Sequence, residues 1–305
     1  MDEIKKNLLK TVSELEELPK GAYNIRIDGE KYARQNSANI EIKTKADKDG
    51  IDIIIKSTAQ NESVHIPVIL TKMNLTDVVY NDFFIEENAV VTIIAGCGIH
   101  CGNNSVSEHS GIHTFYVGKN AKVKYIEKHY GEGTQDSKQI LNPTTNIFIE
   151  DGGVMELLTA QIKGVNSAIR TTNATLKNNA KLIINEKILT TDDQTAETYF
   201  NVQLNGENCS VKVTSRSVAE NTSRQSFNSN INGNNLCFGH VECDAIIKDN
   251  AKVSSTPKIS ANHIDASLIH EAAIGKIAGD QIIKLQTLGL TEEEAEQAII
   301  AGFLK

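Results

Sequence analysis

Tryptophan is absent from this 305-residue chain, and aromatic residues make up only 5 % of it. A sugar-binding cleft draws most of its contact area from stacked rings, so this scarcity disfavours carbohydrate recognition. No window holds 18 consecutive apolar residues, and we therefore expect no membrane-spanning helix. The first residues contain neither a secretory apolar region nor a cleavage site, so we expect a cytoplasmic protein.

The usual signatures of catalysis are also missing. The chain has no Gly-x-x-x-x-Gly-Lys-Ser/Thr phosphate loop, no Gly-x-Ser-x-Gly elbow and no Cys-x-x-Cys pair. Its net charge of −8 repels phosphate backbones, which argues against a nucleic-acid partner. We therefore expect a protein that binds or assembles something, rather than an enzyme with its own ATPase.

Cysteine is scarce and its number is odd, which argues against a disulfide framework in a chain of this length. The five cysteines are Cys97, Cys101, Cys209, Cys237 and Cys243. In a reducing compartment each is either a small buried hydrophobe or a thiol with a chemical role. Cys209 and Cys237 occupy apolar strand positions, so we interpret them as core residues.

What the chain does have is a repeat. Six segments share a polar turn with Asn, Asp or Gly, then a small residue, then a short strand: Glu87–Ile93, Lys119–Tyr125, Glu150–Glu156, Asn178–Ile184, Glu207–Val213 and Asp249–Val253. Their small residues lie roughly 27 to 42 positions apart. Asn and Asp suit such corners because they tolerate a left-handed backbone conformation.

This repeat predicts a solenoid. Each turn is too small to bury its own apolar face, and stacking the turns at about 4.8 Å completes the hydrogen bonds and forms one core. The fold class we predict is mostly β, with a right-handed parallel β-helix as its core. An antiparallel sandwich, whose turns recur about every 8–12 residues, is the rival interpretation.

The two ends of the chain differ from the middle. Residues 2–18 show apolar positions at helical spacing, and alternating strands follow up to about Leu70. Residues from about Glu271 to Lys305 also have helical character, with a capping box from Thr291 to Glu294. We predict an N-terminal helix and strand region over 1–75, a β-helix core over 76–265 and a C-terminal helical region over 266–305.

The first candidate site lies near the end of the predicted solenoid. In a strand Cys243 faces one way while His240 and Glu242 face the other. His270 and Glu271 follow Cys243 by about one solenoid turn, so they are expected above or beside it. A thiolate, an imidazole and a carboxylate together can hold iron. The alternative is a buried cysteine and a surface His-Glu pair.

The second candidate site is rich in glycine, cysteine and histidine. It contains Cys97, His100 and Cys101, with His109 and His113 downstream. These side chains are secondary candidates for holding zinc or an iron–sulfur cluster. The alternative is a glycine-rich loop whose cysteines pack inside the solenoid.

The chain also resembles a known family, SufB/SufD. The matching motifs, in chain order, are Ala95-Gly96-Cys97, His113, Cys243-Asp244, Pro257, His270-Glu271-Ala272, Gly275-Lys276-Ile277, Asp280-Gln281, Gly289–Ala295 and Ile300–Phe303. The C-terminal part of this series is an ordered string of more than sixty residues, and it is highly specific. Before about residue 75 the match is weak.

The resemblance implies a scaffold that assembles iron–sulfur clusters together with a SufC-type ABC ATPase. It implies that Cys243 and Glu271 are essential to assembly and that His270 is functional, with a transient cluster at the interface of a scaffold dimer. It also implies that the C-terminal helices grip the ATPase. We expect this docking to involve Asp280, Gln281, Gly289, Leu290 and Phe303.

Some features depart from the family pattern. The chain is shorter than a typical SufB, lacks an early Cys-x-x-Cys motif and adds the pair Cys97 and Cys101. It looks most similar to short archaeal-type scaffolds, in which one chain forms a homodimer and the complex holds two ATPases. Two alternatives stay open: a SufD-like subunit that binds no cluster, and a β-helix enzyme acting on polysaccharide. The sulfur donor is not indicated.

Overall fold

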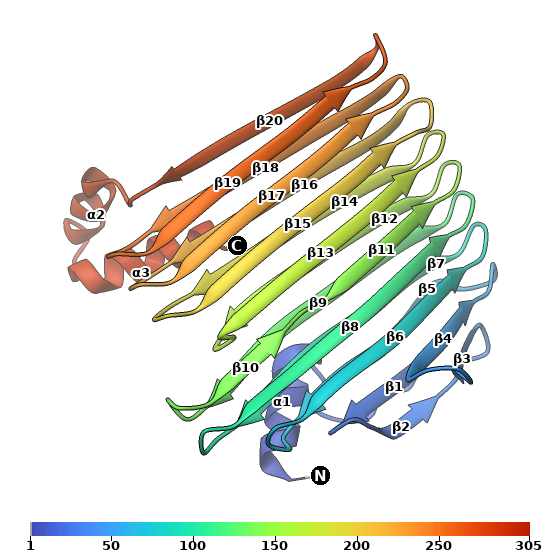
Figure 1. Ribbon diagram of the computed structural model, residues 1–305, viewed down its shortest axis with the longest axis horizontal. Helices are drawn as coiled ribbons and strands as arrows, with labels where there is room; N and C mark the ends of the chain where they lie inside the picture. Colours follow the sequence, from blue (N-terminus) through green and yellow to red (C-terminus); the bar gives the residue numbers. More distant parts are fainter. Residues whose placement is uncertain (1) are drawn as a thin grey trace.

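The computed structural model describes residues 2–305, and two long sheets dominate it (Figure 1). Sheet A contains, in spatial order, β2 (Glu30–Gln35), β1 (Ala22–Ile27), β5 (Gln60–Leu70), β7 (Val90–Cys101), β9 (Lys122–Gly133), β12 (Val154–Lys163), β14 (Lys181–Thr190), β16 (Cys209–Ala219), β18 (Cys237–Ile247) and β20 (Ala266–Gly275). Sheet B contains β19 (Lys252–Ala261), β17 (Arg224–Gly233), β15 (Thr195–Leu204), β13 (Ser167–Leu176), β10 (Lys138–Leu141) with β11 (Thr144–Ile149), β8 (Val106–Val117), β6 (Thr76–Ile85), β4 (Gly50–Ile55) and β3 (Ile40–Thr44).

The chain alternates between the two sheets, and consecutive coils stack in parallel register along one axis. From β16 to β18, for example, eleven successive residue pairs keep one register, from Cys209–Cys237 to Ala219–Ile247. The predicted parallel β-helix is therefore confirmed, and the antiparallel sandwich is wrong. Antiparallel pairing occurs in β1–β2 and β3–β4, at the N-terminal end.

The repeated corners explain why the chain can coil at this spacing. Asn88, Asn120, Asn179, Asn208 and Asp249 all have a φ between 55° and 61°, the left-handed region that Asn and Asp tolerate. The small residue one or two positions after each of them is at most 8 % exposed: Ala89, Ala121, Ala180, Cys209 and Ala251. Because these positions are buried in a close-packed interior, a larger side chain would be poorly tolerated, and the sequence repeat reflects this packing.

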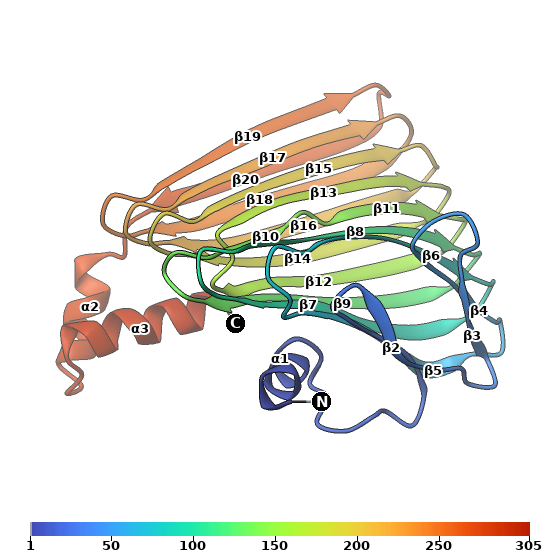
Figure 2. The same cartoon turned by 60° about the horizontal axis from the view of Figure 1, so that its bottom comes forward.

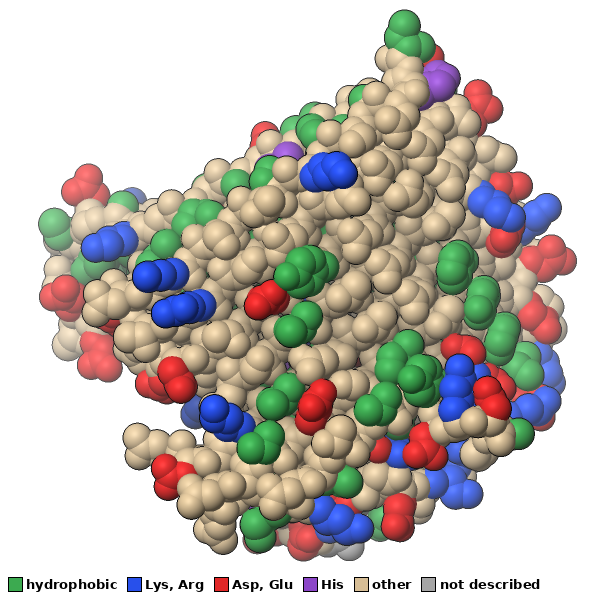
Figure 3. Space-filling model, in the orientation of Figure 1, with side chains coloured by type: hydrophobic (Ala, Val, Ile, Leu, Met, Phe, Trp, Pro, Cys, Tyr) green, Lys and Arg blue, Asp and Glu red, His purple; other side chains and the backbone are tan. Residues whose placement is uncertain are grey.

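The core lies between the two sheets and consists of the inward half of each alternating strand. Apolar side chains form one large cluster in this core, and the rings of Phe83 and Phe115 stack within it with centroids 4.3 Å apart. Cys209 and Cys237 are 1 % and 5 % exposed, so their interpretation as core residues is confirmed. Figure 3 shows one outer face of the solenoid, and this face carries few charged side chains across its middle.

Helix α1 (Glu3–Ser13) packs on the outer face of sheet A at strands β5, β7 and β9 (Figure 2). It is shorter than predicted, because Glu14 takes a left-handed conformation with φ 58° and ends it before Pro19. Its buried side chains Leu8 and Val12 rest on β7. A Cβ on Gly96 would lie 2.5 Å from the backbone oxygen of Val12, so this glycine is needed for the close approach of α1.

The C-terminal end differs most from the prediction. Residues around Glu271 form β20, not a helix, because they pair in register with β18 as a further strand of sheet A. The helices begin later, with α2 (Gly279–Gln286) and α3 (Glu292–Phe303). The capping box between Thr291 and Glu294 is confirmed. Within residues 2–305, no helix has the length and apolar character needed to cross a membrane.

Candidate functional site

A row of polar side chains runs through the interior of sheet A. Parallel pairing aligns Glu127, Thr159, Glu186, Ser215 and Cys243, in that order, on successive strands from β9 to β18. All five are at most 4 % exposed. Because neighbouring strands lie about 4.8 Å apart, the row extends roughly 19 Å along the axis. It ends at Cys243, the principal residue predicted from the sequence.

Cys243 points into the solenoid and is 2 % exposed. The predicted alternation is confirmed, because Val241 is buried beside it while His240 and Glu242 lie on the outer face, only partly covered. Burial raises the pKa of the Cys243 thiol to about 11, although the neighbouring Ser255 hydroxyl opposes the shift. The thiol is therefore protonated at neutral pH, and a metal that binds it must displace the proton.

His270 faces the same interior, one strand further along. It pairs in register with Val241, while Ala272 is the partner of Cys243, so the imidazole is displaced from the thiol by two positions. Neither ring nitrogen has a hydrogen-bond partner among residues 2–305, and the hydroxyl of Ser255 also lacks one. Burial lowers the pKa of His270, which favours the neutral imidazole that binds metals. The arrangement offers, near a thiol, an imidazole with one nitrogen lone pair available to a metal.

Glu271 lies on the other side of β20. It faces outward, and its Oε2 is 3.0 Å from Nε2 of His240. Within one chain the structure therefore brings Cys243 and His270 to the interior but directs Glu271 away from them. A metal ion shared by Cys243 and Glu271 stays a prediction, and it would require the edge strand β20 to turn or a second chain to contribute one ligand.

Cys97 and Cys101 both point inward from β7 and are at most 2 % exposed. Four residues along a strand separate their Cα atoms by about 13 Å, too far for two thiolates on one zinc ion. Cys101 instead accepts a hydrogen bond from Nε2 of Gln139 at 3.0 Å. The structure thus does not bring this pair together. Both cysteines pack inside the solenoid, as in the alternative interpretation, but from strand β7 and not from a loop.

The histidines of the second candidate site do not all face the same side of the sheet. His100 faces outward, and its Nδ1 lies 3.0 Å from Glu132. His113 faces inward from β8, where its Nδ1 lies 2.8 Å from the Tyr125 hydroxyl. His109 and His113 both line one internal cavity of about 10 Å³ together with Cys97. No group of three or more Cys, His, Asp or Glu side chains within residues 2–305 has the geometry of a metal site.

An ionic cluster that the sequence did not reveal lies beside this cavity, with Glu127 and His129 in the cavity wall. Arg170 of β13 reaches across the core to Glu127, and its Nη2 lies 3.1 Å from Nδ1 of His129. Burial alone would raise the pKa of Glu127, but Arg170 and His129 hold it well below its usual range. The only sequence signal was a charged residue at an inward strand position. Its partners could not be identified because 43 positions separate Arg170 from Glu127.

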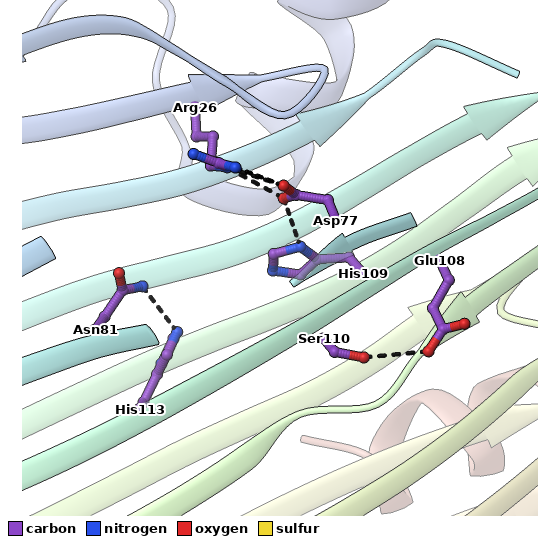
Figure 4. A network of polar contacts seen from close by, with 7 residues as sticks. All are labelled: Arg26, Asp77, Asn81, Glu108, His109, Ser110 and His113. Carbon is purple, nitrogen blue, oxygen red and sulfur yellow. Dashed lines mark hydrogen bonds and ion pairs between the residues drawn. The ribbon is translucent and has the colours of Figure 1, made fainter. Parts of the chain in front are cut away.

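A second polar network lies at the N-terminal end of the solenoid (Figure 4). Arg26 donates two hydrogen bonds from Nε and one from Nη2 to Asp77, whose Oδ2 is 3.0 Å from Nδ1 of His109. His109 and Arg26 lower the pKa of Asp77 to about 2, against the opposing effect of burial. Beside them, Asn81 contacts Nε2 of His113 at 3.2 Å.

The residues predicted to dock a partner lie on α2, α3 and the turn between them. Asp280 and Gln281 are exposed in the first turn of α2, and Gly289 adopts φ 98° after it. Leu290 is half-buried, while the ring of Phe303 lies 5.9 Å from the guanidinium of Arg216 on the solenoid. Thus α3 packs on the solenoid, whereas α2 buries no residue within the described chain.

Comparison with known proteins connects this architecture to one family. Residues 71–303 match the family model described as SUF system FeS cluster assembly, SufBD core domain. An iron–sulfur cluster assembly SufBD family protein of Methanocaldococcus jannaschii is 28 % identical over 79 % of this chain and 76 % of its own length. The protein of that name from Archaeoglobus fulgidus is 28 % identical over 87 % and 71 %. A Pyrococcus horikoshii relative is 27 % identical over 92 % and 86 %.

Proposed function

Since the chain belongs to the SufBD family of iron–sulfur cluster assembly proteins, we propose that it is a scaffold on which a cluster is built at Cys243. The observation that carries this proposal is the buried thiol near His270, whose two ring nitrogens are both without a partner among residues 2–305. Buried polar atoms are almost always hydrogen-bonded, so an imidazole with both nitrogens unpaired beside a thiol fits a ligand-binding role. The cluster is cargo that the scaffold releases, and it leaves these donors free.

The proposed chemistry follows from the donor types. A deprotonated Cys243 supplies a thiolate, which iron–sulfur clusters favour, and His270 supplies a neutral imidazole. Glu271 supplies a hard carboxylate from the outer face and is the least well placed of the three. Because the buried thiol is protonated, loading iron releases a proton, and assembly is expected to be faster at higher pH.

Two partners belong to the proposal. A SufC-type ABC ATPase would dock on α2 and its turn, where Ile283 and Leu288 are 58 % and 76 % exposed. The chain carries no phosphate-loop motif, so ATP hydrolysis is assigned to that partner. A second copy of the chain would cover the open end of the solenoid at β19 and β20, which makes the working unit a homodimer with two ATPases in the cytoplasm.

Two other functions were open from the sequence. A SufD-like subunit that binds no cluster has the same fold, and it differs from our proposal only in what Cys243 does. The polysaccharide-active enzyme has no support beyond the β-helix architecture itself, which hosts many functions. Family membership favours the assembly role over that enzyme.

The deciding experiment replaces Cys243 with serine. The Cys243→Ser variant should fold normally but form no cluster in anaerobic reconstitution with iron and sulfide, because it lacks the thiolate and nearly keeps the volume. Cluster formation is read from visible absorbance and bound iron. Cys209→Ser is the matched control, since Cys209 is equally buried but lies outside the polar row, and it should form a cluster. A cluster of wild-type yield on Cys243→Ser would refute the assignment.

A further inference from the structure

A pocket of about 210 Å³ lies at the N-terminal end of the solenoid. The side chains that matter here are Asn24, Arg26, Lys31, Arg34, Thr44 and Asp49, which come from β1, β2, β3 and the turn before β4. We call this the mouth pocket. Its inner wall is formed by Ile66 and Val68 of β5, which point into the solenoid.

The mouth pocket is lined mainly by positively charged side chains, whereas the whole chain has a net charge of −8. Three cations line the pocket but only one carboxylate, that of Asp49. Arg26 is matched by Asp77 beneath it. Lys31 and Arg34 have no ion-pair partner among residues 2–305, so the pocket carries unbalanced positive charge.

Arg34 is the residue for which this imbalance matters most. It is half-buried, and its two side-chain hydrogen bonds go to neutral acceptors, the oxygen of Asn24 at 2.8 Å and the hydroxyl of Thr44 at 2.7 Å. Burial lowers the pKa of Arg34, because no carboxylate offsets the loss of solvent. Arg170 differs from Arg34 in this respect. Burial also acts to lower its pKa, but the carboxylates of Glu127 and Glu186 have the larger effect and raise it. Burying a charge without a counter-ion is unfavourable.

We propose that the mouth pocket binds a small inorganic anion between Arg34 and Lys31 and that, during cluster assembly, this anion is hydrosulfide. The second half of the proposal rests on the scaffold function. Hydrosulfide carries sulfur at the oxidation level of a bridging sulfide, so it needs neither oxidant nor reductant and only loses its proton on binding iron. The pocket is therefore an entry site for the sulfur source.

The route inward favours this anion over larger ones. Ile66 and Val68 line both the mouth pocket and the internal cavity that contains Cys97 and His113. The Asp77–His109 and Asn81–His113 contacts connect the same two regions (Figure 4). The internal cavity, about 10 Å³, holds roughly one water-sized group. Phosphate, with five heavy atoms, is too large for it, whereas hydrosulfide has a single heavy atom.

Binding is tested on the full chain, anaerobically and without iron or ATPase. Sodium hydrosulfide, sodium phosphate and sodium chloride are titrated at constant ionic strength and followed by calorimetry. Wild type should bind hydrosulfide. Arg34→Gln should bind it about tenfold more weakly, since a charge-assisted contact is lost. Arg224→Gln is the charge-matched control, an exposed arginine on β17, and it should bind like wild type.

The Lys31→Gln variant gives a second test of binding that does not depend on how well Arg34→Gln folds. Lys31 is exposed and its side chain makes no hydrogen bond within the described residues, so its removal should weaken binding and leave the melting temperature unchanged. Equal hydrosulfide binding by wild type, Arg34→Gln and Lys31→Gln would overturn the proposal. Binding of phosphate but not hydrosulfide would overturn the sulfur assignment. Because iron is absent, neither result depends on whether Cys243 holds a cluster.

Discussion

At the scale of single residues, one part of the interior is polar, although most buried side chains are apolar. Glu127, His129 and Arg170 are all buried, and each depends on the charges or hydrogen bonds of the others. Such groups are costly when their partners are missing, so the cluster fixes the relative positions of the two sheets at this level. The same physics makes the stability of the fold dependent on pH.

His113 allows a direct test of this pH dependence. Burial lowers its pKa to about 4 from the usual 6.5, although the charge of Glu127 opposes the shift. The unfolded chain therefore takes up a proton before the folded chain does. The contribution of His113 is complete above about pH 6.5 and is lost as the pH falls towards 4, by about 3 kcal/mol.

Urea unfolding of wild type and His113→Gln at several pH values between 7 and 4 measures this effect. Glutamine can retain polar contacts at this position without titrating, so the variant should lose less unfolding free energy over the same range. Some dependence should remain, because the pKa of His129 is also lowered by burial. Identical pH profiles for the two proteins would contradict the prediction.

At the scale of elements, helix α1 and strand β7 fit together through a glycine. Gly96 lies beneath Val12, and Gly98 lies against Leu8 in the same way. The packing of α1 thus explains why glycine precedes Cys97 in the family-like motif, because any side chain at this position would push α1 away from the sheet.

Gly96→Val should therefore loosen α1 without unfolding the solenoid. Its first added carbon would lie 2.5 Å from the Val12 oxygen, so we expect a loss of about 1–3 kcal/mol and faster proteolysis before residue 20. Gly102→Ala is the control, because the nearest atom, in Thr134, is 3.6 Å away. Limited proteolysis with mass spectrometry reads the outcome. An unchanged cleavage pattern in Gly96→Val would argue against this packing.

At the scale of the whole molecule, the two ends of the solenoid are unlike. Antiparallel hairpins close the N-terminal end, whereas β19 and β20 are edge strands at the other. Ile259 faces inward like its register partner Ile231, yet it is 44 % exposed where Ile231 is 1 % exposed. A solenoid end without a cap is an association surface, because exposed core positions and unpaired strand edges favour contact with another chain.

The expected partner at this end is a second copy of the chain. Ile259→Glu should weaken the dimer at least tenfold, since it places a charge on a surface that becomes buried. Ile169→Glu is a closely matched control, because Ile169 is also 44 % exposed but lies on the outer face of β13. Sedimentation equilibrium gives the masses. A monomeric wild type, or equal dimerisation of both variants, would exclude this interface.

The sequence alone determined the β-helix, the corner residues, the alternation of Cys243 with His240 and Glu242, and the capping of α3. All of these depend on neighbours within a few positions or on a regular repeat, which is why they can be read from one chain. The tertiary structure decided the rest. It turned the residues around Glu271 into a strand because the edge of β18 was available for pairing. It also joined Arg170 to Glu127 and placed Arg34 in a pocket, because stacking coils brings together side chains that lie far apart in sequence.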